Sequence, residues 1–454
     1  MLIRNTASFI KRVFEVFKNA ALPALLEGNL EQSRYSIFTA IPYLSLTTLG
    51  DKTVIQDLKC SRETTTDPLA LVKTYLNKKS IAHDLPFPGG AIGYFSYDLA
   101  RRYEKFSHIA QCDIAIPDMQ VAFYDWALII DHKLQQAELV RHPEPELPNA
   151  QWQEIVTKIE AIAKSTIELQ TSATFQLHSP FVSNLTQVEY QKAFSRIQDY
   201  ILAGDCYQVN LAQRFTAQVS GSPWAAYCKL SQEIKAPFSA FLQYDNCAIL
   251  SLSPERFLKV CDTKVETKPI KGTRPRHLDP HLDAKLAQEL SQSTKDQAEN
   301  LMIVDLMRND LSKVCKPGSV KVPKLFDIES FTTVHHLVST VTGELMDGKH
   351  PIDILKACFP GGSVTGAPKI RAMQIIEELE PHRRSVYCGS IGYIGFNGSM
   401  DTNIAIRSLI WTENKLHCYA GGAIVADSKV DEEYQETLTK IERILRLLQI
   451  GSVS

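Results

Sequence analysis

The sequence lacks closely spaced cysteines, long apolar runs and an excess of either charge. Its ten cysteines are scattered along 454 residues, which excludes the short-spaced cysteine pairs of zinc sites and redox motifs. No apolar run reaches the roughly 18 residues that a membrane span needs. The formal net charge is -2, from 49 basic and 51 acidic residues, so no overall field favours nucleic acid or an anionic membrane. We therefore expect a cytoplasmic protein with reduced thiols, in which local charges hold any anionic ligand.

Several signatures of catalytic machinery are also missing. The glycine-rich segment 361–369 superficially resembles a phosphate loop, but Ala367 and Pro368 interrupt it where a nucleotide-binding motif needs Gly-Lys-Ser/Thr. The sequence has no Gly-x-Ser-x-Gly elbow. It also has no Gly-x-Cys-x-Gly loop with a downstream His-x-Glu, the signature of a glutamine amidotransferase. These absences argue against an NTPase, a serine hydrolase and a glutaminase.

The chain divides into three regions by pattern. Runs of aromatic and β-branched residues at 34–38 and 121–130 predict strands in an N-terminal lobe over residues 1–140. Three prolines within 142–148 begin a linker with a connecting helix, over 141–185. A capping box opens the third region, 186–454, in which helices and strands alternate without the regular period of a Rossmann or barrel fold. The expected fold class is α+β.

The segment 431–448 predicts an amphipathic helix with two carboxylates on its polar face. Spacings of three and four residues bring Glu433, Glu436 and Lys440 together. One interpretation is a solvated polar stripe; the other is a site for a hard cation such as Mg²⁺ beside a lysine that meets an anionic ligand. The residues expected to pack on the body of the protein are Tyr434, Leu438, Ile441, Leu445 and Leu448.

Two further carboxylates stand in apolar surroundings. Glu299 lies at the start of an apolar helical segment, 298–307, where a buried carboxylate needs either a capping role or a shared metal ion. Glu255 follows an apolar strand. It is either paired with a base such as Arg256 or a general acid whose pKa is raised.

Lys271 has no acidic residue within four positions on either side. It is either a plain loop lysine or a nucleophile, because burial and the neighbouring positive charges would both favour its neutral form. The residues around it do not decide between these interpretations.

Together these motifs resemble the chorismate-utilising enzymes, the family of anthranilate synthase component I, isochorismate synthase and salicylate synthase. They follow the order of the family over residues 186–450, and segments 89–94 and 97–98 of the N-terminal lobe also fit. The matching segments are 206–210, 253–257, 269–273, 299–302, 308–311, 336–337, 361–369, 371–373, 389–393, 406–408, 421–428 and 433–437.

The resemblance implies a two-lobed α+β fold, with packed antiparallel β-sheets surrounded by helices and an active site in a cleft. Carried over by position, Glu299, Glu433 and Glu436 would hold a Mg²⁺ ion that bridges to the ring carboxylate of chorismate. The residues that would bind the substrate are His336, Thr365, Tyr393, Arg407, Gly421, Gly422 and Lys440.

The Lys271 position separates branches of this family. Most members resemble Pro-Ile-Ala-Gly-Thr there, whereas the lysine version is similar to the branch that replaces the C4 hydroxyl of chorismate by an amine. The resemblance implies that Lys271 attacks C2 while Glu255 protonates the leaving hydroxyl, giving 4-amino-4-deoxychorismate for 4-aminobenzoate and folate biosynthesis. Gln208 stands where the water-using members have a lysine, which argues against water as the nucleophile. The alternatives are anthranilate synthase component I and a non-catalytic subunit that binds an aromatic acid.

Ammonia for this reaction implies a separate glutamine amidotransferase (glutaminase) subunit as partner, so we expect a heterodimer. Members of the family can also hold tryptophan in the N-terminal lobe. The corresponding residues here are Gly28, Gln32, Ser33, Arg34, Tyr35, Pro237, Phe238 and Ser239.

Overall fold

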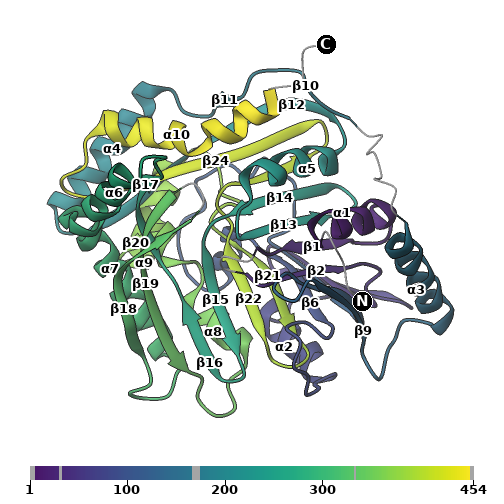
Figure 1. Ribbon diagram of the computed structural model, residues 1–454. Helices are drawn as coiled ribbons and strands as arrows, with labels where there is room; N and C mark the ends of the chain where they lie inside the picture. The colour runs from purple at the N-terminus through teal and green to yellow at the C-terminus, as the bar shows by residue number, and fades with distance from the viewer. Residues whose placement is uncertain (1–5, 30–32, 166–173, 332–333, 450–454) are drawn as a thin grey trace.

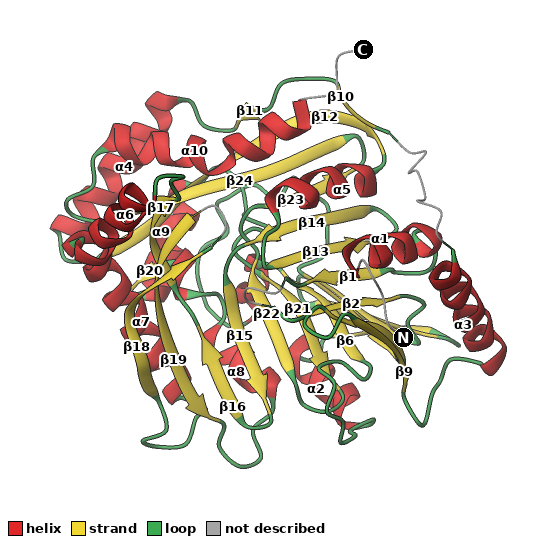
Figure 2. Ribbon diagram, in the orientation of Figure 1, coloured by secondary structure: helices red, strands yellow, loops and turns green. Residues whose placement is uncertain are grey.

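The structure is a computed structural model, described here for residues 6–29, 33–165, 174–331 and 334–449 (Figure 1). Within these ranges the chain forms two twelve-stranded sheets with helices around them (Figure 2), and all pairings between named strands are antiparallel. None of the described helices is long and apolar enough to cross a membrane. The predicted α+β class is confirmed.

The first sheet follows the order β10 (Phe175–Leu177), β12 (Gln208–Gly221), β24 (Lys415–Ile424), β23 (Ser408–Thr412), β14 (Cys247–Ser253), β13 (Phe238–Gln243), β1 (Ala24–Glu27), β2 (Tyr35–Thr39), β8 (Trp126–Asp131) and β9 (Gln136–Arg141). Two short strands pair with β12: β11 (Val182–Ser183) and β20 (Gly366–Ala367).

The second sheet follows the order β17 (Ile270–Pro275), β19 (Val334–Glu344), β16 (Lys264–Thr267), β15 (Arg256–Cys261), β22 (Met400–Ile404), β21 (Ser390–Gly395), β6 (Gly90–Phe95), β7 (Met119–Tyr124), β3 (Leu44–Leu49), β4 (Lys52–Asp57) and β5 (Ser61–Thr64). Its remaining strand, β18 (Lys321–Ser330), pairs with β19.

Strands of the N-terminal region pair with strands of the region 186–454 in both sheets. In the first sheet β1 pairs with β13, with Leu25 opposite Phe241. In the second sheet β6 pairs with β21, with Gly93 opposite Gly392. Residues 1–140 therefore extend both sheets of the region 186–454.

The predicted strand run 121–130 divides at Asp125 into two strands of different sheets. Asp125 is buried, and its carboxylate accepts hydrogen bonds from the backbone N–H groups of Glu146, at 2.5 Å, and Leu147, at 3.0 Å. A buried carboxylate needs such donors, and here they come from the proline-rich linker. The hydrophobic residues continue on both sides of Asp125, so the sequence pattern alone predicts a single strand.

The first sheet is covered on both faces, as the alternation along β8 shows. Trp126, Leu128 and Ile130 join the core beneath the outer helices, whereas Ala127 and Ile129 join a core that contains residues of both sheets. Each large side chain buried in this way stabilises the fold by about 1.5–3 kcal/mol. The helices that contribute to the outer core are α1 (Thr6–Phe17), α3 (Asn149–Lys164), α5 (Pro223–Ile234) and α10 (Val430–Gln449).

The helix α4 (Gln187–Leu202) begins at the predicted capping box. The Thr186 hydroxyl accepts from the Glu189 N–H at 3.2 Å, and the Thr186 N–H donates to the Glu189 carboxylate at 2.8 Å. The remaining α-helices of the described chain are α2 (Pro68–Asn77), α6 (Pro280–Gln292), α7 (Thr294–Ser312), α8 (Pro351–Cys358) and α9 (Lys369–Leu379). Both α6 and α7 contact β17 and β19 (Figure 1), at the edge of the second sheet.

Candidate active site

A cavity of about 630 Å³ is lined by β24 of the first sheet, β17 and β19 of the second, and the helices α7 and α10. Segments far apart in the sequence therefore meet around one volume. The predicted site residues that line it are Glu255, Lys271, Glu299, His336, Arg407, Gly421, Gly422, Glu433, Glu436 and Lys440.

Lys271 reaches this cavity from a bulged strand. The register between β17 and β19 shifts after Lys271, and the intervening Gly272 has a φ of +72°. Lys271 Nζ lies 3.7 Å from Glu299 Oε2, so the acid absent from its sequence neighbourhood comes from α7. Burial lowers the pKa of Lys271, against the opposing effect of the Glu299 charge. The amine therefore loses its proton more readily than the amine of an exposed lysine.

Glu255 is a buried carboxyl on the wall of the cavity. Ser363 Oγ donates a hydrogen bond to its Oε1 at 2.8 Å, and burial raises its pKa to about 7. Arg256 binds Asp401 instead, with 3.0 Å between its Nε and Oδ1. Glu255 is therefore not paired with Arg256, the alternative that the sequence left open. Its pKa near neutrality suits a general acid.

The carboxylates of α10 are packed against the backbone of β24. A Cβ on Gly422 would lie 3.0 Å from Glu433 Oε2, so glycine lets the strand approach this carboxylate. Glu433 is only 4% exposed, and Ser428 Oγ donates to it at 2.7 Å. Its pKa is raised by burial and by the negative charge of Glu436. The polar face is therefore solvated only in part, because Glu433 is buried whereas Glu436 and Lys440 are exposed along the cavity.

The buried face of α10 differs from the predicted one for the same reason. Its buried residues are Glu433, Thr437, Ile441, Ile444 and Leu448, whereas Tyr434, Leu438 and Leu445 are half-buried. Glu433 packs against Gly422 of β24, and Thr437 accepts a hydrogen bond from Gln213 of β12 at 2.6 Å. Part of the polar side of α10 is therefore buried together with its apolar side, which hydrophobicity alone does not indicate.

The three carboxylates predicted to bind Mg²⁺ surround the cavity without forming a compact cluster. Among the described residues, no group of three or more metal-ligating side chains is arranged to hold an ion. Each carboxylate meets a lysine instead, in the pairs Lys271–Glu299 at 3.7 Å, Lys295–Glu433 at 3.9 Å and Lys440–Glu436 at 2.6 Å. Carboxylate oxygens are suitable donors for a hard cation, so the donor set fits Mg²⁺, and its binding stays a prediction.

Arg407 supplies positive charge that none of the described residues neutralises. It has a φ of +50°, an uncommon conformation for a residue with a side chain. Its guanidinium lines the cavity and makes no hydrogen bond or ion pair with any of the described residues. An unpaired guanidinium in a cavity is suited to a carboxylate ligand.

His336 contributes a neutral ring. Its Nδ1 lies 2.9 Å from Thr273 Oγ1, and burial lowers its pKa to about 4. At neutral pH the imidazole therefore offers a hydrogen bond but no charge.

The structure places two predicted site residues elsewhere. Thr365 is fully buried, and its hydroxyl donates to the Gly361 carbonyl at 3.0 Å, outside the cavity lining. Tyr393, in β21, lines a different pocket. The tyrosines that line the catalytic cavity are Tyr387 and Tyr419, stacked with their ring centroids 5.2 Å apart. Tyr387 was missed because it lies in the same glycine-rich stretch as Tyr393, and no local pattern distinguishes them.

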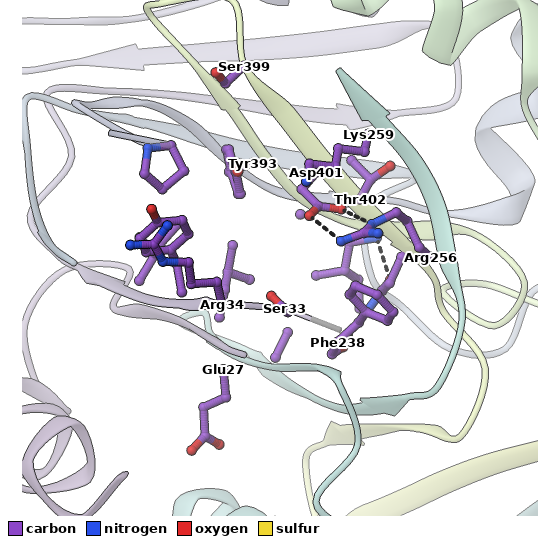
Figure 3. A pocket seen from close by; sticks show the side chains of 18 of the residues that line it. Glu27, Ser33, Arg34, Phe238, Arg256, Lys259, Tyr393, Ser399, Asp401 and Thr402 are labelled. Atoms are coloured by element: carbon purple, nitrogen blue, oxygen red, sulfur yellow. Dashed lines mark hydrogen bonds and ion pairs between the residues drawn. The ribbon is translucent and has the colours of Figure 1, made fainter. Parts of the chain in front are cut away.

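The pocket that contains Tyr393 has a volume of about 400 Å³ and is lined by β1, β2 and β13 of the first sheet and by β15, β21 and β22 of the second (Figure 3). Of the residues predicted for a tryptophan pocket, it is lined by Ser33, Arg34, Tyr35, Phe238 and Ser239. Gly28 and Pro237 are not among the lining residues of the described chain, and Gln32 falls outside the described ranges. Arg34 is paired with Asp131, with 2.9 Å between its Nε and Oδ1. Tryptophan binding stays a prediction.

Comparison with known proteins agrees with this geometry. A family model described as chorismate binding enzyme matches residues 32–446. Aminodeoxychorismate synthase component 1 of Escherichia coli (strain K12) is 50% identical over 421 residues, which cover 92% of this chain and 90% of the relative. Anthranilate synthase component 1 of Pseudomonas aeruginosa is 35% identical over 452 residues, which cover 96% and 91%.

The solved structure of anthranilate synthase component I from Streptococcus pneumoniae TIGR4 matches with a TM-score of 0.81 and 32% identity, covering 93% of this chain and 94% of that one. Family model, relatives and fold agree over almost the whole chain, and the resemblance drawn from the motifs is confirmed. This chain belongs to the chorismate-binding enzyme family.

Proposed function

We propose that this chain is an aminodeoxychorismate synthase component I, which converts chorismate and ammonia to 4-amino-4-deoxychorismate. The observation that carries the proposal is the buried Lys271 amine on the wall of the cavity that also contains Glu255. The difference between 50% identity to an aminodeoxychorismate synthase component 1 and 35% to an anthranilate synthase component 1 supports the same assignment.

In the first proposed step the neutral Lys271 Nζ forms a bond to C2 of chorismate. The electrons of the C1–C2 double bond move to C1–C6, those of C5–C6 move to C4–C5, and the C4–O bond breaks. Glu255 protonates the departing hydroxyl, which leaves as water, and becomes a carboxylate. The lowered pKa of Lys271 and the raised pKa of Glu255, about 7, both favour the protonation state that this step needs.

In the second step ammonia forms a bond to C4 and the electron shifts reverse. The bond between C2 and Nζ breaks with its electron pair returning to Lys271, which leaves as a neutral amine. The Glu255 carboxylate takes a proton from the new C4 ammonium. Lysine and glutamic acid both return to their starting states, and the enolpyruvyl ether of chorismate is retained.

The two carboxylates of chorismate need positive charge in the cavity. Arg407 is one candidate because no described residue neutralises its guanidinium. Glu299, Glu433 and Glu436 would hold a Mg²⁺ ion, which when bound supplies positive charge to the ring carboxylate. Without Mg²⁺, the lysines paired with these three glutamates would offset part of their repulsion of the anionic substrate.

We also propose that ammonia comes from a separate glutaminase subunit. The relatives are named component 1, which implies a second component. The sequence of this chain contains no amidotransferase signature of its own. Free ammonium at high concentration should therefore replace the partner.

The test is to incubate the purified chain with chorismate, Mg²⁺ and ammonium, and to identify the products by chromatography and mass spectrometry. We expect 4-amino-4-deoxychorismate, with no release of pyruvate. Anthranilate with an equimolar amount of pyruvate would instead assign the chain to anthranilate synthase. Binding of chorismate without turnover, with ammonium or with a glutaminase partner, would identify it as a non-catalytic binding subunit.

A further inference from the structure

Ser363 lines the catalytic cavity, although the sequence motifs gave it no role. It lies in the glycine-rich segment 361–369, between Gly362 and Val364. Its Oγ donates to Glu255 Oε1 at 2.8 Å, and it is the side-chain hydroxyl that contacts this carboxyl in the described structure.

The backbone around Ser363 is held from behind by polar groups. Asn210 Nδ2 donates to the Ser363 carbonyl at 2.9 Å. The buried Arg384 donates to the carbonyls of Val364 and Asn210, each at 2.8 Å, and forms a 2.6 Å ion pair with Glu380. These contacts hold the carbonyls of Ser363 and Val364, and the Thr365 hydroxyl holds the Gly361 carbonyl on the other side. The Ser363 side chain therefore extends from a fixed backbone, and its hydrogen bond to Glu255 orients the hydroxyl.

We infer that Ser363 is a positioning residue, which orients the Glu255 carboxyl so that its Oε2 carries the proton delivered to the C4 hydroxyl of the substrate. This inference rests on the proposed function, in which Glu255 is the acid. The Ser363 hydroxyl donates to Oε1, so Oε1 acts as the acceptor oxygen of the acid and the transferable proton lies on Oε2.

The same hydrogen bond also assists the reaction. When Glu255 loses its proton, the acceptor oxygen becomes part of a carboxylate, and hydrogen bonds to charged acceptors are stronger than those to neutral ones. Ser363 therefore stabilises the product of proton transfer more than the starting acid. Consistent with this, the hydrogen bond lowers the pKa of Glu255 against the larger raising effect of burial. The charges of Lys271 and Lys440 and the backbone of Ile270 lower it as well, and these are unchanged in the variants compared below.

The decisive variants are Ser363→Thr and Ser363→Val, which have the same shape and differ in the hydroxyl. Wild type and both variants are assayed with chorismate and ammonium across pH, and kcat is separated from KM. We expect Ser363→Thr to retain most of the activity. Ser363→Val should lose about tenfold or more in kcat with little change in the KM for chorismate. The control for removal of a hydroxyl is Ser195→Ala, because Ser195 is an exposed serine on α4 whose hydroxyl donates to the Gln191 carbonyl.

The pH profile distinguishes positioning from general damage. The acid must be protonated, so kcat/KM falls as pH rises past the pKa of Glu255. Loss of a donor that favours the carboxylate raises that pKa, so in Ser363→Val this fall should move about one pH unit higher. Ammonium titrates equally in all variants and cancels in the comparison.

A direct titration makes the test independent of turnover. The infrared carbonyl band of protonated Glu255, assigned by its loss in Glu255→Gln, should titrate at higher pH in Ser363→Val than in Ser363→Thr. Equal titration and equal kcat in the two variants would overturn the inference. If the wild type made no 4-amino-4-deoxychorismate the proposed function would fail, yet the infrared comparison would still show whether Ser363 controls Glu255.

Discussion

At the residue scale, the candidate chemistry depends on charges that come from distant segments. Lys271 has no acid near it in sequence, but in the fold it meets Glu299, 3.7 Å away. Burial favours the neutral amine and the glutamate favours the ammonium. The balance between them keeps a basic amine in the cavity that can still lose its proton to become a nucleophile.

The covalent role of Lys271 is testable in the absence of ammonia. Incubation of the wild-type chain with chorismate and Mg²⁺ should give an adduct whose mass equals that of the protein plus chorismate less one water. Lys271→Ala should form no adduct and lose at least about a hundredfold in turnover, because the substitution removes the proposed nucleophile. Lys295→Ala, which removes a more exposed lysine of the same cavity, is the matched control for charge and should still form the adduct. An adduct in Lys271→Ala, or unchanged turnover, would contradict the mechanism.

At the element scale, the bulge in β17 directs Lys271 toward α7. Gly272 has a φ of +72°, and a Cβ there would lie 2.7 Å from Leu290 Cδ1 and 2.8 Å from Asp296 Cγ. The glycine therefore satisfies both a left-handed backbone and a close approach to two helices. A larger residue would have to move the side chains of Leu290 and Asp296, or shift β17, which carries Lys271.

We expect Gly272→Ala to damage catalysis more than stability. Strain and the clash should lower the free energy of unfolding by about 1–3 kcal/mol and shift the lysine, reducing kcat by about tenfold or more. Gly318→Ala is the control, since Gly318 has a φ of +75° but open space around it. It should lose about 1 kcal/mol of stability and keep its kcat. Thermal melts measure the loss of stability, and assays of turnover and of adduct formation measure the effect on Lys271. Equal kcat in the two variants would show that the bulge does not position Lys271.

Some features of the helices and strands could be predicted from the sequence, and others could not. The capping box at Thr186 predicted the start of α4, because capping is a local interaction between a side chain and the next turn. The run 121–130 and the buried face of α10 were less predictable, since the change of sheet at Asp125 and the burial of Glu433 depend on partners elsewhere in the chain.

At the scale of the whole molecule, the N-terminal 140 residues are structural partners of the catalytic region. The strand β1 pairs with β13 and β6 pairs with β21, and one core contains residues of both sheets. A fragment without these strands would expose unpaired strand edges and apolar surface. The active site lies in the region 186–454, but its supporting sheets are shared.

We therefore expect a fragment of residues 186–454 not to fold cooperatively by itself. Calorimetry should show no sharp unfolding transition for this fragment, whereas mixing it with a 1–185 fragment should restore a transition and activity with ammonium. A cooperative melt of 186–454 alone, together with chorismate binding, would show instead that it is an autonomous domain.

The sequence by itself determined the family, the substrate class and most of the residues around the cavity, because those residues belong to short motifs that occur in a specific order. Only the tertiary structure decided which side chains share the cavity. It placed Tyr387 there and Tyr393 in the other pocket, and it joined Ser363 to Glu255. The physical reason is that proximity between segments far apart in the chain, and the burial that changes the pKa of Lys271 and Glu255, exist only after the two sheets have packed.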